Sequence, residues 1–228
     1  MAILAPLLDL AVTRVSTAEQ VADAIREQLL QGVISPGTRL PDQTIASSMR
    51  VSRNTVREAM TILASQGLVT KQLHHGVIVA ELSLDELTDV YQARRALEVA
   101  GLRAGAKSDG EWRVELRAAL KDMEEAIAAE DLRAVLDADT NFHRALVSPI
   151  GSKRINQVYL NLQTELRLTS AWYGEREEGP SFGRRHKRIV TAIGANDFDR
   201  AELLVVELID AGEARLRQQL LEPRAQTK

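Results

Sequence analysis

Near the start of the chain, the spacing of apolar residues predicts three helices followed by two short strands. The predicted helices cover 17–30, 41–49 and 53–66, and the predicted strands cover 68–73 and 76–80. In each helix the apolar side chains recur every three or four residues and form one face. Arg50 and Val51 leave room only for a tight turn between the second and third helices. This pattern predicts a helix-turn-helix with a β-hairpin wing beside it.

From Leu84 onward the pattern predicts helices and no convincing strand. The predicted helices cover 84–107, 109–130, 131–148, 152–174, 183–196 and 197–221, and the longest predicted loop is 174–183, which contains Gly179-Pro180. Aromatic residues make up 4% of the chain, while Leu, Ala and Val are frequent. That composition suits a helical bundle.

We therefore expect a mainly α protein with two domains. The predicted winged helix-turn-helix domain covers 17–80, and an all-α helical bundle covers 84–222. An N-terminal extension, 1–16, and a short tail, 223–228, flank them. No stretch is apolar for the roughly 20 residues that a membrane-spanning helix needs. The chain has no cysteine, which excludes disulfides and thiolate metal sites. We expect a cytoplasmic protein that does not enter a membrane.

The start of the third predicted helix carries the chemistry expected of a DNA-contact surface. Ser52 is a good N-cap, and Arg53, Asn54, Thr55 and Arg57 follow it, largely off the apolar face. Such a helix start offers amides and positive charge to phosphates, and arginine and asparagine side chains to base edges. An ordinary surface helix with a basic first turn is the alternative that this stretch alone leaves open.

Three further residues are candidates for weaker DNA contacts. Gln43, at the start of the preceding helix, could reach the DNA backbone, and His75 and Gly76 at the hairpin tip could enter the adjacent minor groove. Residues 1–80 hold seven Lys/Arg against six Asp/Glu, and the remainder holds 22 against 26, so +1 and −4 give the net charge of −3. With so little positive charge, we expect a homodimer that doubles the contacts on a palindromic double-stranded DNA operator.

The first eighty residues resemble the GntR family of bacterial transcription regulators. The matching residues run Gly32-x-Ile34-x-Pro36-Gly37-x-x-Leu40, then Ile45-Ala46, Val51-Ser52-Arg53-x-x-Val56-Arg57-Glu58-Ala59, Leu63, Gly67-Leu68-Val69 and Gly76. Two positions depart from the family. Gln43 stands where Arg is frequent, and Arg50 stands where Gly is usual. If Arg50 is left-handed, it costs roughly 1–2 kcal/mol.

Several polar residues of the bundle fall in phase with the apolar stripes of their helices. Asp139 and His143 lie four residues apart on one helix, and His186 and Arg94 interrupt the stripes of two others. Burying such groups without partners is costly, so they should meet each other, a ligand or a metal. The nitrogen and carboxylate donors suit Zn, Ni or Mn. A hydrogen-bonded pair or salt bridge is the alternative for Asp139 and His143.

The C-terminal part resembles the FCD domain, the all-helical effector domain of the FadR-like branch of GntR regulators. The matching residues are Tyr91-x-x-Arg94-x-x-Leu97-Glu98, Asp139-x-x-Phe142-His143, and His186-x-x-Ile189 leading to Ala192-Ile193, Asp197 and Ala201. The resemblance implies a divalent-metal site of one Asp and three His, with Asp139, His143 and His186 as the first three. Leu208 occupies the position of the fourth ligand, which places metal binding in doubt.

The resemblance also implies a small-molecule effector, often a carboxylic acid. Arg94 is our candidate for the cation that anchors the carboxylate, since its planar fork matches one. The alternative is that Arg94 forms an ion pair with Glu98 or another buried acid. Asn161, Thr164 and Arg167 share a helix and are candidates for lining the same cavity.

Three classes of function compete for these features. A ligand-responsive DNA-binding regulator, which we expect to be a repressor released by a small carboxylic acid, uses both predicted domains. A metal-dependent enzyme built on Asp139, His143 and His186 would leave the first 80 residues without a role. A metal sensor would need tighter binding than three ligands favour. The sequence therefore favours the regulator, without catalysis.

Overall fold

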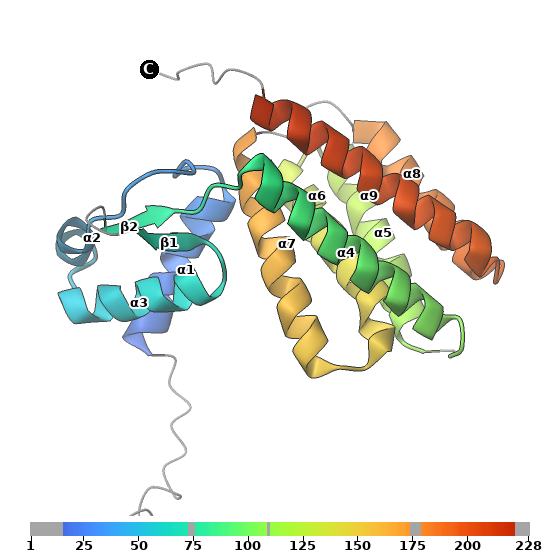
Figure 1. Ribbon diagram of the computed structural model, residues 1–228, viewed down its shortest axis with the longest axis horizontal. Helices are drawn as coiled ribbons and strands as arrows, with labels where there is room; N and C mark the ends of the chain where they lie inside the picture. The colour runs from blue at the N-terminus through green and yellow to red at the C-terminus, as the bar shows by residue number, and fades with distance from the viewer. Residues whose placement is uncertain (1–15, 73–75, 109, 174–178, 222–228) are drawn as a thin grey trace, which may run out of the picture.

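The structure is a computed structural model that describes residues 16–72, 76–108, 110–173 and 179–221. Its first part holds three helices and two strands, shown in blue to cyan in Figure 1. The elements are α1 (Thr17–Leu30), α2 (Asp42–Met49), α3 (Arg53–Ser65), β1 (Val69–Gln72) and β2 (Gly76–Val79). The strands pair antiparallel, with Val69 opposite Val79 and Gln72 opposite Gly76. The predicted winged helix-turn-helix is confirmed.

The second part of the described chain is a bundle of helices, as predicted. It consists of α4 (Leu84–Gly105), α5 (Trp112–Ala128), α6 (Leu132–Val147), a short 3-10 turn η2 (Ser148–Ile150), α7 (Lys153–Tyr173), α8 (Gly179–Gly194) and α9 (Phe198–Leu221). Helix α4 passes close to the end of α6. A Cβ added at Gly101 would lie only 2.2 Å from the carbonyl oxygen of Leu146, so glycine permits the crossing.

Helix α8 begins at Gly179 rather than at 183, so the predicted loop 174–183 was too long at its C-terminal end. Gly179-Pro180 is typical of a loop, but proline also suits the first turn of a helix, where its missing N–H is not needed. Residues 174–178 of that loop lie outside the described part of the chain.

Capping and turn residues fix the winged part. Ser16 and Glu19 form a reciprocal capping box at α1, and the Ser52 side chain accepts from the Thr55 amide at 3.0 Å to cap α3. The predicted tight turn between α2 and α3 is present, and Arg50 is left-handed there, with φ 55° at the end of α2. This conformation is unfavourable for a residue with a Cβ.

Two hydrophobic cores hold the fold, and α7 belongs to both. Leu166 of α7 packs in the core of the bundle, whereas Leu168 is 1% exposed in the core of the winged part, beside α1 and α3. Figure 1 shows α7 as the bundle helix that lies next to the winged part. No helix in the described ranges is both long and apolar enough to cross a membrane.

Candidate functional site

The first candidate surface is the exposed start of α3. Val56, Ala59, Met60 and Leu63 bury the opposite face of this helix. The side chains of Arg53 and Arg57 are 54% and 62% exposed, and Asn54 is also exposed. The Ser52 hydroxyl caps the helix and lies 2.8 Å from the Thr55 hydroxyl, and one O–H of this pair is still able to donate. Arg53, Arg57 and Asn54 thus present their side chains on the exposed side of the helix start.

A groove of about 550 Å³ runs between α2, α3 and the wing. Arg53, Arg57 and Gly76 line it, together with two basic residues that sequence reasoning missed, Arg39 and Lys71. Lys71 could have been found, because it lies on the exposed part of β1. Arg39 reaches the groove through a bridge to Ile78 that only the folded wing creates.

The remaining predicted DNA contacts are placed less clearly. Gln43 is exposed on the first turn of α2 but is not among the residues that line the groove. His75 lies outside the described residues, so its predicted place at the wing tip stays a prediction.

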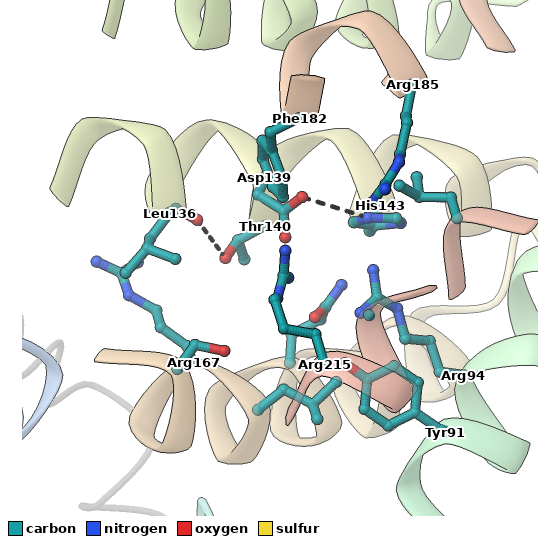
Figure 2. A pocket seen from close by; sticks show the side chains of 15 residues that line it. Tyr91, Arg94, Leu136, Asp139, Thr140, His143, Arg167, Phe182, Arg185 and Arg215 are labelled. Atoms are coloured by element: carbon teal, nitrogen blue, oxygen red, sulfur yellow. Dashed lines mark hydrogen bonds and ion pairs between the residues drawn. The ribbon is translucent and has the colours of Figure 1, made fainter. Parts of the chain in front are cut away.

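The second candidate site is a small cavity of about 40 Å³ inside the bundle. It is lined by residues of α4, α6, α7, α8 and α9, which are Tyr91, Arg94, Leu136, Asp139, Thr140, His143, Gln163, Leu166, Arg167, Ser170, Phe182, Arg185, Leu208, Gly212 and Arg215. In this described lining, Asp139 is the one carboxylate among four arginines. Figure 2 shows Arg215 extending toward Asp139 and Arg185 toward His143 from opposite sides. The cavity therefore favours an anionic ligand.

Asp139, His143 and His186 converge beside this cavity. One donor atom from each lies within 4.8 Å of the others. The Asp139 Oδ1 atom is 3.0 Å from His186 Nε2 and 3.4 Å from His143 Nε2. Both histidines are almost fully buried. The shared phase of these residues with the apolar stripes thus brings all three together, as the sequence indicated.

The other nitrogen of each imidazole is held by an acceptor. His143 Nδ1 lies 2.7 Å from Glu98 Oε2, and His186 Nδ1 lies 2.9 Å from the carbonyl oxygen of Phe182. Each Nδ1 must therefore carry a hydrogen, which leaves Nε2 as the nitrogen of the neutral ring whose lone pair could bind a metal. Carboxylate or carbonyl partners of this kind orient the histidine ligands of metal sites.

Both Nε2 atoms face a carboxylate, and this contact requires positive charge. Burial raises the pKa of Asp139, but His143 and His186 outweigh it and hold that pKa well below its usual range. Burial and the nearby Arg94 lower the pKa of His143. Glu98 and Asp139 raise that pKa by a larger amount, so the net shift is upward. Two unprotonated Nε2 atoms would repel the oxygen between them. Protons on the histidines or a bound cation would remove that repulsion.

Glu98 links His143 of the cluster to Arg94 and Tyr159. Its Oε1 accepts from Arg94 Nε and from the Tyr159 hydroxyl, each at 2.6 Å, and Gln163 donates to Tyr159 at 2.8 Å. Burial would raise the pKa of Glu98, but His143 and Arg94 lower it to about 2. The sequence indicated Glu98 only as an alternative partner of Arg94, and it did not indicate Tyr159 as part of the site. The signal for Glu98 was its place four residues after Arg94.

Arg94 combines the two interpretations that the sequence left open. It pairs with Glu98 through Nε and also lines the cavity, where Figure 2 shows it near Tyr91. Its contact with Glu98 uses Nε, and an arginine has five donors, so the terminal amino groups can serve a ligand in the cavity.

The structure corrects two of the candidate effector contacts. Asn161 and Thr164 are not among the lining residues of the cavity, whereas Arg167 is, and it pairs with Asp137. Asn161 instead donates to the carbonyl oxygen of Ser65 in α3 at 3.4 Å. The reason is helical phase, because the lining residues Gln163, Leu166, Arg167 and Ser170 occupy the opposite side of α7.

Arg185 and Arg215 are lining residues that were not proposed as effector contacts. Arg185 immediately precedes His186 on α8. Arg215 follows Leu208 by seven residues on α9, so the two share a face. Leu208, at the expected place of a fourth metal ligand, lines the cavity.

Comparison with known proteins covers both parts of the chain. Residues 17–79 match the family model described as bacterial regulatory proteins, gntR family, and residues 89–211 match the FCD domain. The gluconate operon transcriptional repressor of Bacillus subtilis is 30% identical over 192 residues, which are 81% of this chain and 79% of that protein. The HTH-type transcriptional repressor RspR of Escherichia coli is 25% identical over 202 residues, 88% of this chain and 89% of that protein.

A similar structure has also been solved. A GntR transcriptional regulator from Rhodococcus sp. RHA1 is 32% identical in sequence, with a TM-score of 0.79. The match covers 92% of this chain and 100% of that one.

Proposed function

The chain belongs to the GntR family of bacterial regulators and carries an FCD domain, and from this premise we propose that it is a transcriptional repressor released from its operator by a small carboxylic acid. The observation that carries the proposal is the pairing of two sites in one chain. One is a basic groove on α3 and the wing, and the other is a cavity in the bundle lined by four arginines.

The groove supports double-stranded DNA as the first ligand. Arg53 and Arg57 sit on the exposed start of α3, the position from which a helix-turn-helix reads base edges in the major groove. Arg39 and Lys71 add positive charge for the phosphates. We propose that two such surfaces, one from each subunit of a homodimer, bind the two halves of a palindromic operator.

The cavity supports an anionic effector. Arg94, Arg167, Arg185 and Arg215 reach it from four different helices, and arginine binds carboxylates with paired hydrogen bonds. One relative is named for a gluconate operon, and gluconate is a carboxylate. The cavity of about 40 Å³ is small for such an acid, so we propose that lining side chains or helices move when the acid binds.

The donor set beside the cavity fits a divalent metal. Asp139, His143 and His186 would hold it through Oδ1 and the two Nε2 atoms, with Glu98 and the Phe182 carbonyl orienting the rings. A bound Zn, Ni or Mn ion would supply positive charge to which an effector carboxylate can bind. Because Leu208 gives no donor, we propose weaker binding than a four-ligand site would have.

Helix α7 offers a route from the cavity to the DNA-binding part. One side of α7 lines the cavity with Gln163, Leu166 and Arg167. The other side contacts the winged part, where Leu168 enters its core and Asn161 binds Ser65. We propose that effector binding moves α7 and thereby changes the separation of the two winged parts in the dimer. Such a device couples two distinct sites.

A metal-dependent enzyme is the weaker candidate. It would use the same cluster and leave the basic groove without a role, and the relatives compared here are named as regulators. The metal nevertheless needs its own test. We expect the dialysed protein to contain metal in less than equimolar amount, and Leu208→His to raise that content by adding a fourth ligand.

The matched control for this metal test is Leu203→His, because Leu203 is 58% exposed on the outer side of the same helix. If Leu208→His and Leu203→His leave the metal content alike, the three residues form a hydrogen-bonded cluster rather than a metal site. In that case chelation leaves effector affinity unchanged.

A further inference from the structure

A single carboxylate joins the two arginines of the DNA-contact surface. Asp42, the first residue of α2, accepts from Arg57 Nε at 2.8 Å and from Arg53 Nη2 at 3.1 Å. The side chain of Asp42 is 28% exposed, and both arginines are more exposed than it is. The hydrogen bond from Arg57 lowers the pKa of Asp42, so the carboxylate is charged at neutral pH.

The Asp42 carboxylate opposes the attraction of the groove for DNA phosphates. Among the described residues that line the groove, Asp42 is the one acid beside Arg39, Arg53, Arg57 and Lys71. A carboxylate there repels phosphate and so weakens the attraction that every DNA sequence shares. Exposed ion pairs contribute little to stability, so stability alone gives a weak reason for it.

The atoms used in these contacts suggest a different role. Arg57 uses Nε to bind Asp42, which leaves its two terminal amino groups as a fork of donors for another ligand. Such a fork matches the O6 and N7 acceptors of guanine. Holding the fork in advance reduces the rotamer entropy that a free arginine loses on binding.

We propose that Asp42 sets the sequence selectivity of DNA binding by holding Arg53 and Arg57 in the groove. It acts as a positioning residue that favours base contacts by the arginines and disfavours their contacts with phosphate. This inference rests on the DNA-binding role proposed above. Repulsion between Asp42 and phosphate and attraction between the arginines and the bases would then both contribute to selectivity.

The test compares Asp42→Asn with the wild-type full-length chain on two duplexes. The first is selected by the wild-type protein from a random pool, and the second is a scrambled duplex of the same base composition. Fluorescence anisotropy at two salt concentrations gives the ratio of the two affinities. We expect Asp42→Asn to bind the scrambled duplex more tightly and to lower the ratio at least about fivefold, the lower end of one bidentate arginine–guanine contact.

Two further variants separate positioning from a structural role. Asp42→Glu keeps the carboxylate and should retain most of the ratio. Asp23→Asn removes an equally charged residue that pairs with Arg26 on α1, and it should leave the ratio unchanged. An acid in the first turn of α2 also stabilises the helix by interacting with its dipole. If that were its only role, Asp42→Asn would lower both affinities and the melting temperature together, with the ratio constant.

A ratio within twofold of wild type for Asp42→Asn would overturn the inference. Failure of the wild-type protein to enrich any duplex from the pool would instead overturn the DNA-binding role itself. The two failures are therefore distinguishable.

Discussion

Glu98 is the side chain on which the bundle cavity depends most, because it contacts three neighbours at once. Arg94, His143 and Tyr159 all meet its carboxylate, and none of the four is more than slightly exposed. The sequence indicated Glu98 only as an alternative partner of Arg94. Its contact with Tyr159 spans 61 residues and arises from the packing of α4 against α7, which periodicity does not predict.

Replacing Glu98 by Gln should destabilise the protein strongly. The change leaves Arg94 buried without its counter-charge, and breaking a buried pair costs roughly 3–5 kcal/mol. Urea unfolding of the two proteins measures the difference. Glu202→Gln is the matched control, since Glu202 pairs with the exposed Arg103 and should change stability by less than about 1 kcal/mol. Equal effects of the two substitutions would contradict the role given to Glu98.

Arg53→Ala and Arg57→Ala should each weaken binding to the selected duplex while the fold is retained. Each base-directed arginine is expected to contribute about 1–3 kcal/mol. Gel-shift titration at fixed salt measures the affinities, and circular dichroism checks the fold. Arg188→Ala removes the same charge from an exposed position on α8 and serves as the control. Affinities within twofold of wild type for both groove variants would remove these arginines from the DNA surface.

At the scale of elements, the type and order of the helices and strands were predictable. The recognition helix follows from the Ser52 cap and the apolar face behind it, and most boundaries lie within a few residues of those expected. The orientation of helix α7 was harder to predict because the helix is buried on two sides. Leu166 and Leu168 face different cores, so apolar spacing did not fix which polar residues line the cavity. Asn161 and Thr164 were misplaced for this reason.

Because α7 touches both parts, Leu168→Ala should weaken the communication between effector and DNA. In the wild-type protein we expect a bound acid to weaken duplex affinity by about 5- to 150-fold, the usual range of allosteric coupling. The variant should lose at least half of that factor while its affinity for the acid is unchanged. Anisotropy titrations with and without acid measure both.

The control for Leu168→Ala is Val158→Ala, an apolar truncation at a 56% exposed position of the same helix. It should keep the wild-type coupling. Removing a buried leucine leaves a cavity that costs about 2–5 kcal/mol, so melting curves must show that the variant is folded at the assay temperature. Leu168→Val provides a milder version of the same test. Full coupling in both Leu168 variants would exclude this face of α7 as the route.

At the scale of the whole molecule, two domain types were predictable but their contact was not. The winged part meets the bundle through polar and apolar contacts between distant residues, such as Arg133 with Glu27 at 3.2 Å. No local pattern marks such pairs. The single chain also has a modest basic surface, since residues 1–80 carry a net charge of only +1 from seven basic and six acidic residues. This limitation is the reason to expect a dimer.

Sedimentation equilibrium of the full chain should therefore give a mass of twice 25.2 kDa at micromolar concentration. Two winged parts double the phosphate contacts and match the symmetry of a palindromic operator. A mass of one chain, both alone and with the selected duplex, would contradict the dimer.

The most direct test of the account measures whether an acid bound in the bundle releases DNA from the groove. A thermal-shift screen of small carboxylic acids identifies the one that stabilises the protein most. Anisotropy then follows the selected duplex during titration with that acid. We predict that duplex affinity falls at least about fivefold at saturation, the lower end of typical coupling. An acid that stabilises the protein but leaves duplex affinity unchanged would contradict a regulator controlled through this cavity.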